Sequence, residues 1–319
     1  MPNIKHEIEQ DAKVVVEDIS KHTVYTLFVA IIASLITSGL FFLFINKKIN
    51  TLFSFTPTVK TVIIPPPKEE LYVERGSPYD NRTIASESAN VIFHGPRDKK
   101  KIALTFDAEM TDGMKADLIT GRVKSSYDKR IVDILNQTQT KATIFLTGMW
   151  IELYPNVTRQ LSNNPLFELG SHSYTDSSYH GFCYGLKQIP ATLAIEEIGA
   201  TEKLLRNIAG IDNRLFRFPG GCYTPDDVKL VNEADDTVVH WDVSAADGFN
   251  SNTYQIIHNV IDNVQNGSII IMHLNGAPNS PRTADALPQI ISTLKGRGYE
   301  FVKVSDLLSL QPAPKAKSF

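Results

Sequence analysis

The sequence predicts an α/β domain built as a (β/α)7-type barrel, preceded by a single N-terminal transmembrane helix and a stalk. Two observations predict this organisation. One apolar segment near the N-terminus is long enough to cross a bilayer, and between residues 98 and 310 short apolar segments alternate with amphipathic ones. Strands that alternate with helices are typical of a mostly parallel sheet.

The composition excludes several classes of protein. Hydrophobic residues make up 42% of the 319 residues and charged residues 21%, as in ordinary globular proteins. Acidic residues outnumber basic ones, 35 to 32, and no basic cluster stands out, so nucleic acid is not an expected partner. Two cysteines are too few for a disulfide scaffold or a four-cysteine zinc site.

The apolar segment at residues 24–46 is interpreted as a membrane anchor. No charged residue lies between Lys21 and Lys47, and a spanning helix needs about 20 apolar residues. The run ends on Phe41–Phe44 with no small-residue cleavage site after it, which favours an uncleaved anchor over a signal peptide. Lysines are equally frequent on both sides, so their distribution does not determine the orientation.

The remaining segments flank this anchor and the main domain. Residues 1–23 form a polar N-terminal tail, and residues 47–97 resemble a stalk in which Pro65–Pro67 favour extended geometry. Residues 98–310 form the main domain, and residues 311–319 a flexible tail.

Seven short apolar segments are the predicted strands of the main domain. Helices fit between many of them, and residues 254–264 and 284–294 each place their aliphatic side chains on one face. Seven such units favour a closed barrel over an open two-layer sheet. The predicted strands are Ile102–Phe106, Ala142–Leu146, Leu166–Leu169, Leu215–Phe218, Val238–Val243, Ile269–Met272 and Tyr299–Val304.

Reactive side chains lie at the carboxyl ends of five predicted strands. In parallel β/α folds these ends meet at one edge, where chemistry gathers. A single Asp or His at a strand end would be weak evidence for a functional site, but five such groups at one edge predict one. They are Asp107, His172, Arg217, the pair Asp242 and Asp247, and His273.

Five motifs in order resemble those of the polysaccharide deacetylases, carbohydrate esterase family 4, which share the NodB homology domain. The motifs are TFDAEMT, HSYTD, RFPGG, WDVSAADG and IMH, and the resemblance covers residues 98–309. It implies a distorted barrel of seven or eight β/α units. It also implies a hydrolase that uses a divalent metal ion to remove acetyl groups from the N-acetylated sugars of a polysaccharide.

The resemblance implies a general base, a general acid and a partner for each. Asp107 corresponds to the base and His273 to the acid. Arg217 would hold Asp107 ionised, and Asp247 would raise the pKa of His273, with Asp242 as an alternative for that role. The structural alternatives are a helix-capping Asp107 and a His273 satisfied by backbone groups.

Further residues are assigned to substrate binding by the same resemblance. Backbone N–H groups around Gly220, Gly221 and Tyr223 would stabilise the oxyanion. Trp241 would line the acetyl pocket or belong to the core. His240 and His258 are expected to be structural.

The metal motifs depart from the family pattern of one Asp and two His. The usual Asp position holds Ala108 and the second His position holds Asp176, so only His172 keeps its type. Glu109, His172 and Asp176 form the predicted ligand set, with His180 as a further candidate. The metal would be Zn, Mn, Mg or Co, and a carboxylate-rich set favours Mn²⁺ or Mg²⁺ over Zn²⁺.

The two cysteines, Cys183 and Cys222, lie beside the second and third motifs. In an oxidising compartment they would form a disulfide, and otherwise two buried thiols.

These observations predict a single-pass membrane enzyme whose extracytoplasmic domain deacetylates peptidoglycan or an N-acetylglucosamine polymer. The alternatives are a catalytically impaired glycan-binding or scaffolding protein, and a hydrolase of amides in smaller molecules.

Overall fold

The computed structural model describes residues 91–212 and 214–310. The predicted N-terminal tail, the anchor at 24–46, the C-terminal tail and the stalk up to residue 90 lie outside these ranges. Within them, no helix combines the length and the apolar character needed to cross a membrane.

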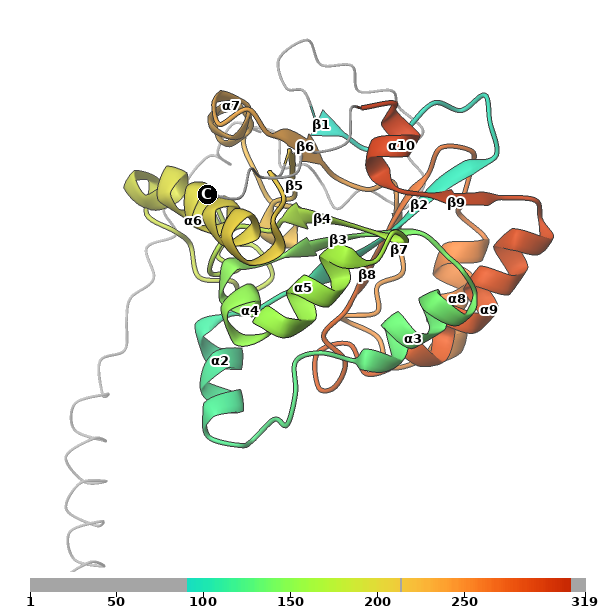
Figure 1. Ribbon diagram of the computed structural model, residues 1–319, viewed down its shortest axis with the longest axis horizontal. Helices are drawn as coiled ribbons and strands as arrows, with labels where there is room; N and C mark the ends of the chain where they lie inside the picture. Colours follow the sequence, from blue (N-terminus) through green and yellow to red (C-terminus); the bar gives the residue numbers. More distant parts are fainter. Residues whose placement is uncertain (1–90, 213, 311–319) are drawn as a thin grey trace, which may run out of the picture. The chain divides into compact units, whose positions relative to one another are not determined.

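Strands and helices alternate along the described chain, as the sequence predicts (Figure 1). Most predicted strands coincide with observed ones within two residues. The strands are β1 Val91–Ile92, β2 Lys101–Ala108, β3 Ala142–Leu146, β4 Phe167–Ser171, β5 Leu215–Phe216, β6 Thr237–Val239, β7 Val243–Ser244, β8 Ile269–His273 and β9 Glu300–Val302. The helices are α2 Asp112–Ile119, α3 Lys129–Gln137, α4 Gly148–Leu153, α5 Pro155–Asn163, α6 Ala194–Leu204, α7 Pro225–Glu233, α8 Thr253–Ile261, α9 Thr283–Gly296 and α10 Val304–Leu308.

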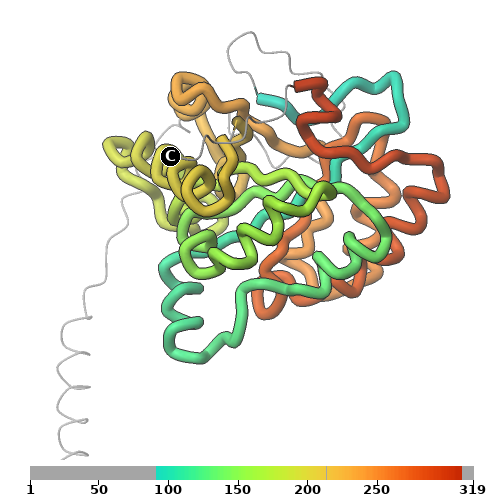
Figure 2. The backbone as a smooth tube through the Cα atoms, in the orientation of Figure 1, coloured from blue at the N-terminus to red at the C-terminus, as the bar shows by residue number. Residues whose placement is uncertain are grey.

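All paired strands run parallel in a single nine-stranded sheet. The order is β1-β6-β5-β4-β3-β2-β8-β7, and β9 also pairs with β2. Figure 2 shows the first and last parts of the described chain, cyan and red, side by side where β2 meets β9. The α/β class and the parallel sheet are confirmed.

The prediction of one strand over Val238–Val243 and of a closed barrel is wrong in detail. The chain forms β6, leaves the sheet, and re-enters it as β7 at the other end of the strand order. Among the described residues no ladder joins β1 to β7, so the curled sheet stays open there. β1 lies within the segment predicted as stalk, yet it pairs with β6 through Val91 and Ile92.

Alternation along β2 determines where the site lies. Ile102, Leu104 and Phe106 face one way and join the large cluster that packs against α3, α8 and α9. Ala103 faces the opposite way, into a second cluster with Phe145, Leu215, Val239, Ile269 and Val302, which Val304 and Leu307 of α10 close. Thr105 and Asp107 continue this inner face towards the carboxyl end, so the apolar interior leads to a polar site.

A buried carboxyl pair lies away from that edge. Asp236, just before β6, is 4% exposed, and neither of its carboxyl oxygens meets a hydrogen-bond donor within the described residues. Burial, followed by a hydrogen bond with Glu202 of α6, raises the pKa of Asp236 from 3.8 to about 9. The folded protein therefore keeps a proton on this pair that the unfolded chain releases.

Asp236→Asn is expected to make stability less dependent on pH. With a raised pKa, Asp236 stabilises the fold fully at low pH, and this contribution is lost as the pH rises from about 4 towards 9. The Asn amide donates to Glu202 without titrating. The melting temperature of the variant at alkaline pH should therefore exceed that of the wild type, by about 2–4 °C per kcal/mol gained. Asp226→Asn, at an exposed side chain on the first turn of α7, is the control. If the melting temperature of Asp236→Asn equals that of the wild type at every pH from acid to alkaline, the prediction is wrong.

Candidate active site

Asp107 and Arg217 form a buried ion pair at the carboxyl end of the inner face. Arg217 Nη1 lies 2.7 Å from Asp107 Oδ1 and 2.9 Å from Thr105 Oγ1. The guanidinium lies over the Phe145 ring at 4.0 Å and donates to two backbone carbonyls, so every part of it has a partner. Burial lowers the pKa of Arg217, although the Asp107 charge opposes this shift. The pairing predicted for these two residues is present.

His273 is held by Asp247, as one of the two sequence alternatives proposes. Its Nδ1 lies 2.8 Å from Asp247 Oδ1, and its backbone N–H donates to Oδ2 at 2.9 Å. Burial opposes a charged imidazole, but the charges of Asp247 and Glu109 outweigh it and hold the pKa of His273 well above its ordinary value. Burial would raise the pKa of Asp247 too, yet the His273 charge and three hydrogen bonds lower it. The pair is therefore an imidazolium beside a carboxylate.

Asp242, the alternative partner for His273, is engaged elsewhere. Its Oδ2 pairs with Arg97 at 2.7 Å and accepts from Ser268, and its Oδ1 accepts from the Ile269 N–H. These bonds fix the chain where it enters β7 and β8. Asp242 is therefore structural.

The proposed base and acid face the same site. Asp107 and His273 are register partners on the adjacent strands β2 and β8. Asp107 Oδ2 lies 3.7 Å from His172 Nε2, and His273 Nε2 lies 3.4 Å from Glu109 Oε1. Because Glu109 and His172 lie close together, these contacts join the two groups through one cluster.

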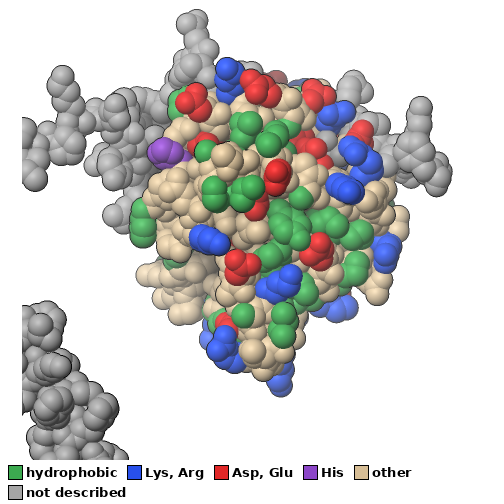
Figure 3. All heavy atoms as spheres, turned by 90° about the vertical axis from the view of Figure 1, so that its left-hand side faces the viewer, with side chains coloured by type: hydrophobic (Ala, Val, Ile, Leu, Met, Phe, Trp, Pro, Cys, Tyr) green, Lys and Arg blue, Asp and Glu red, His purple; other side chains and the backbone are tan. Residues whose placement is uncertain are grey.

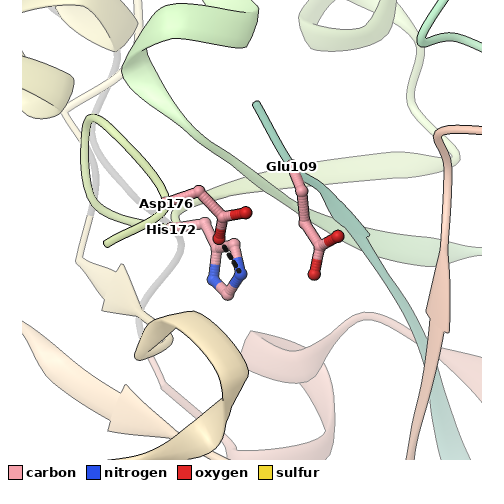
Figure 4. A group of neighbouring side chains, drawn as sticks. All are labelled: Glu109, His172 and Asp176. Carbon is pink, nitrogen blue, oxygen red and sulfur yellow. Dashed lines mark ion pairs between the residues drawn. The ribbon is translucent and has the colours of Figure 1, made fainter. Parts of the chain in front are cut away.

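Glu109, His172 and Asp176 converge as a group that could hold a metal ion (Figure 4). One ligand atom of each lies within 4.8 Å of the others. His172 Nδ1 bonds to the Arg217 carbonyl at 2.9 Å, which fixes the proton on Nδ1 and leaves the Nε2 lone pair for a ligand. Both His172 Nε2 and Asp176 Oδ1 are buried without a hydrogen-bond partner. Such orphaned atoms fit a cation, and His180, which is exposed, lies outside the group.

Glu197 organises the loop that carries two of these ligands. Its carboxylate accepts from the backbone N–H groups of Tyr174 and Thr175 at 2.9 and 2.8 Å and from the Ser173 hydroxyl at 2.8 Å. Asp176 follows with φ 56°, a left-handed conformation that few residues other than Gly adopt. Sequence reasoning missed Glu197, because it lies on α6 and belongs to none of the motifs.

Asn275 positions Glu109. It accepts from the Glu109 N–H at 3.0 Å and donates to the Glu109 carbonyl at 2.7 Å, and it is 1% exposed. Burial raises the pKa of the nearby Asp176 well above its ordinary value, and the charges of Glu109 and Asp107 add to this. A cation would relieve this repulsion among carboxylates. Asn275 lies two residues after the IMH motif, and this position was the only sequence signal that could have indicated its role.

The turn at Gly220–Tyr223 offers fewer oxyanion donors than expected. The Gly221 N–H donates to the Phe218 carbonyl at 2.9 Å, and the Cys222 N–H to Pro219 at 3.4 Å. Within the described residues, only the N–H groups of Gly220 and Tyr223 in this turn lack a protein acceptor.

Trp241 lines this turn and is half-buried. A Cβ atom at residue 221 would lie 2.5 Å from the Trp241 ring. The position of this ring therefore requires a glycine at residue 221. The Trp241 ring stacks on His240 at 3.9 Å, and burial lowers the pKa of His240 to about 4. His258 of α8 pairs with Asp262, the residue that follows this helix. Both histidines have structural partners, as expected.

Cys183 and Cys222 form a disulfide. It joins the loop after β4 to the Gly220–Tyr223 turn across 39 residues of sequence. Of the two alternatives left by the sequence, the disulfide is the one present.

Replacing both cysteines by Ser is expected to destabilise the fold by about 2–4 kcal/mol, since the cross-link restricts the unfolded chain. Thermal unfolding with and without reductant measures this. With reductant, the wild type should melt at about the temperature of the double variant. Reductant should not change the melting temperature of the double variant. Equal melting temperatures for all four samples would contradict the prediction.

The described domain is similar to known proteins in sequence and in fold. Residues 94–239 match the family model described as polysaccharide deacetylase. Over these residues the chain is similar to the polysaccharide deacetylases. A peptidoglycan-N-acetylglucosamine deacetylase of Bacillus cereus is 29% identical over 215 residues, 67% of this chain and 70% of that protein.

Solved structures share the fold. That of a peptidoglycan N-acetylglucosamine deacetylase aligns with a TM-score of 0.60 at 27% identity and covers 72% of this chain and 97% of that one. A family 4 pseudoenzyme from Bacillus anthracis aligns with a TM-score of 0.56 at 22% identity over 68% of each chain. The curled parallel sheet of this chain is thus similar to the fold of these structures.

Proposed function

We propose that this protein is a metal-dependent deacetylase that removes acetyl groups from the N-acetylated sugars of a cell-envelope polysaccharide, peptidoglycan or an N-acetylglucosamine polymer. One observation carries the proposal. An Arg-paired carboxylate and an Asp-paired imidazole lie on adjacent strands and face one cluster of metal-ligand type. The names of the relatives, which include peptidoglycan deacetylases, support the substrate class.

The residues divide the reaction between them. Asp107, paired with Arg217, takes a proton from the attacking water. His273, held protonated by Asp247, gives a proton to the amine as the carbon–nitrogen bond breaks. Water thus supplies the hydroxyl of acetate, and the sugar leaves as the free amine.

Glu109, His172 and Asp176 would hold the divalent ion. When bound, the ion polarises the amide carbonyl and lowers the barrier to attack. Two carboxylates and one imidazole form a harder ligand set than two imidazoles and one carboxylate, so we expect Mn²⁺ or Mg²⁺ to be preferred over Zn²⁺ or Co²⁺.

We further propose that residues 24–46 anchor the chain as a single span, with the domain outside the cytoplasm. The disulfide supports this, since such bonds persist in oxidising compartments. Tethering would raise the local concentration of the enzyme at an insoluble polymer.

Acetate release by the full-length protein in detergent tests the function, with peptidoglycan and N-acetylglucosamine oligomers as substrates. Chelation should abolish release and Mn²⁺ should restore it. His172→Ala should lower bound metal, measured by elemental analysis, and His258→Ala is the matched control. Activity that persists without stoichiometric metal would refute the metal mechanism.

A glycan-binding protein without activity is the second candidate. Ala108 and Asp176, which replace the usual ligand types, favour it. Oligomer binding by the metal-loaded protein without acetate release would decide for this candidate.

A further inference from the structure

Two exposed aromatic rings meet beside the site. Tyr184 is 58% exposed and Phe249 is 73% exposed, yet their ring centroids lie only 5.1 Å apart, tilted by 40°. They come from different loops, one after β4 and one after β7. Figure 3 shows the face on the left-hand side of Figure 1, where hydrophobic side chains lie among charged ones.

This aromatic pair, Tyr184 and Phe249, lies on two loops that pass the proposed site. A Cβ at Gly220 would lie 3.3 Å from Tyr184 Cδ2, so this ring packs against the proposed oxyanion turn. A Cβ at Gly248, directly before Phe249, would lie 3.2 Å from His273 Cε1. Tyr184 therefore packs against the proposed oxyanion turn, and Phe249 belongs to the loop that passes His273.

Tyr184 occupies a backbone position that does not suit it. The Leu186 N–H donates to the Cys183 carbonyl at 2.8 Å, closing a turn whose central residues Tyr184 and Gly185 have φ of 50° and 82°. Positive φ at both positions favours Asn, Asp or Gly. The disulfide at Cys183 holds the turn in place although Tyr184 does not favour this conformation. An unfavourable Tyr with an exposed ring beside a site indicates a function other than stability.

We propose that the aromatic pair binds a sugar ring of the glycan, next to the sugar that is deacetylated. This inference rests on the proposed function and adds a subsite to it. The C–H faces of a pyranose are flat and apolar, and stacking on exposed rings removes both surfaces from water. Continuity with Gly220 and His273 identifies the occupant as the same polymer chain.

Tyr184→Asn is the most informative variant, because Asn suits the turn and the fold should remain at least as stable. Phe249→Ala removes the second ring. Tyr254→Ala is the matched control, since Tyr254 is 67% exposed but packs on His258 of α8. Affinity for short and long N-acetylglucosamine oligomers is measured by calorimetry on the full-length protein, and KM and kcat by acetate release.

We expect both variants to bind the long oligomer about tenfold more weakly, equivalent to about 1.4 kcal/mol. KM should rise by the same factor, with kcat and monosaccharide binding unchanged. Tyr254→Ala should match the wild type.

The outcomes separate this inference from the proposed function. Ring-dependent oligomer binding without acetate release would uphold the subsite and overturn the deacetylase. Acetate release with unchanged oligomer affinity in both variants would overturn the subsite alone.

Discussion

Asp107→Asn is expected to lower the rate of acetate release by about 10²–10⁴-fold, the usual contribution of a general base. An amide has the shape of the carboxylate but cannot take a proton from water. The loss should appear in kcat, because the change leaves the proposed substrate contacts at Tyr223, Trp241 and the aromatic pair in place. Rates are measured on metal-loaded protein.

The same change should weaken the fold, which provides an independent check. Arg217 is fully buried and would keep its charge without an ionised partner. Loss of one member of such a pair destabilises by about 3–5 kcal/mol. Asp226→Asn, on the exposed first turn of α7, is the control for both measurements. An Asp107→Asn protein with wild-type kcat would exclude Asp107 as the base.

His273→Gln is expected to lower kcat by about 10²–10⁴-fold, because an amide cannot protonate the departing amine at neutral pH. Asp247 keeps the hydrogen bonds from Thr283 and from the backbone of residue 273, so the local structure should persist. An activated ester of the same acyl group, whose leaving group needs no proton, should be hydrolysed at nearly the wild-type rate.

His258→Gln is the matched control, since this histidine also pairs with an Asp but lies on α8. Equal losses for the amide and the activated ester would show that residue 273 does not act as the acid.

Local patterns were sufficient for the elements that depend on near neighbours. The apolar run of β3 matches its predicted range in full, and α9 contains the predicted helix. The strand ends also predicted Asp107, His172 and His273 as neighbours, because parallel strands present their carboxyl ends at one edge. The prediction of one strand over Val238–Val243 failed, because apolar residues occur both in strands and in the buried segments that connect them.

Partners distant in sequence could not be predicted from these patterns. Asn275 holds Glu109 from 166 residues away, and the local patterns alone do not choose between Asp247 and Asp242 as the partner of His273. In each case the partner depends on strand register and on which way a loop turns, and neither is encoded in spacing. Glu197 belongs to the same class, since its role arises only where α6 packs beside the loop of Asp176.

By itself the sequence determined the α/β class and the reactive residues at the strand ends, because these depend on residue type and on periodicity along the chain. Only the tertiary structure decided that Glu109 joins His172 and Asp176, that Cys183 and Cys222 are bonded, and that Tyr184 meets Phe249. These contacts join loops from different strands, and their distances are determined by how the sheet curls.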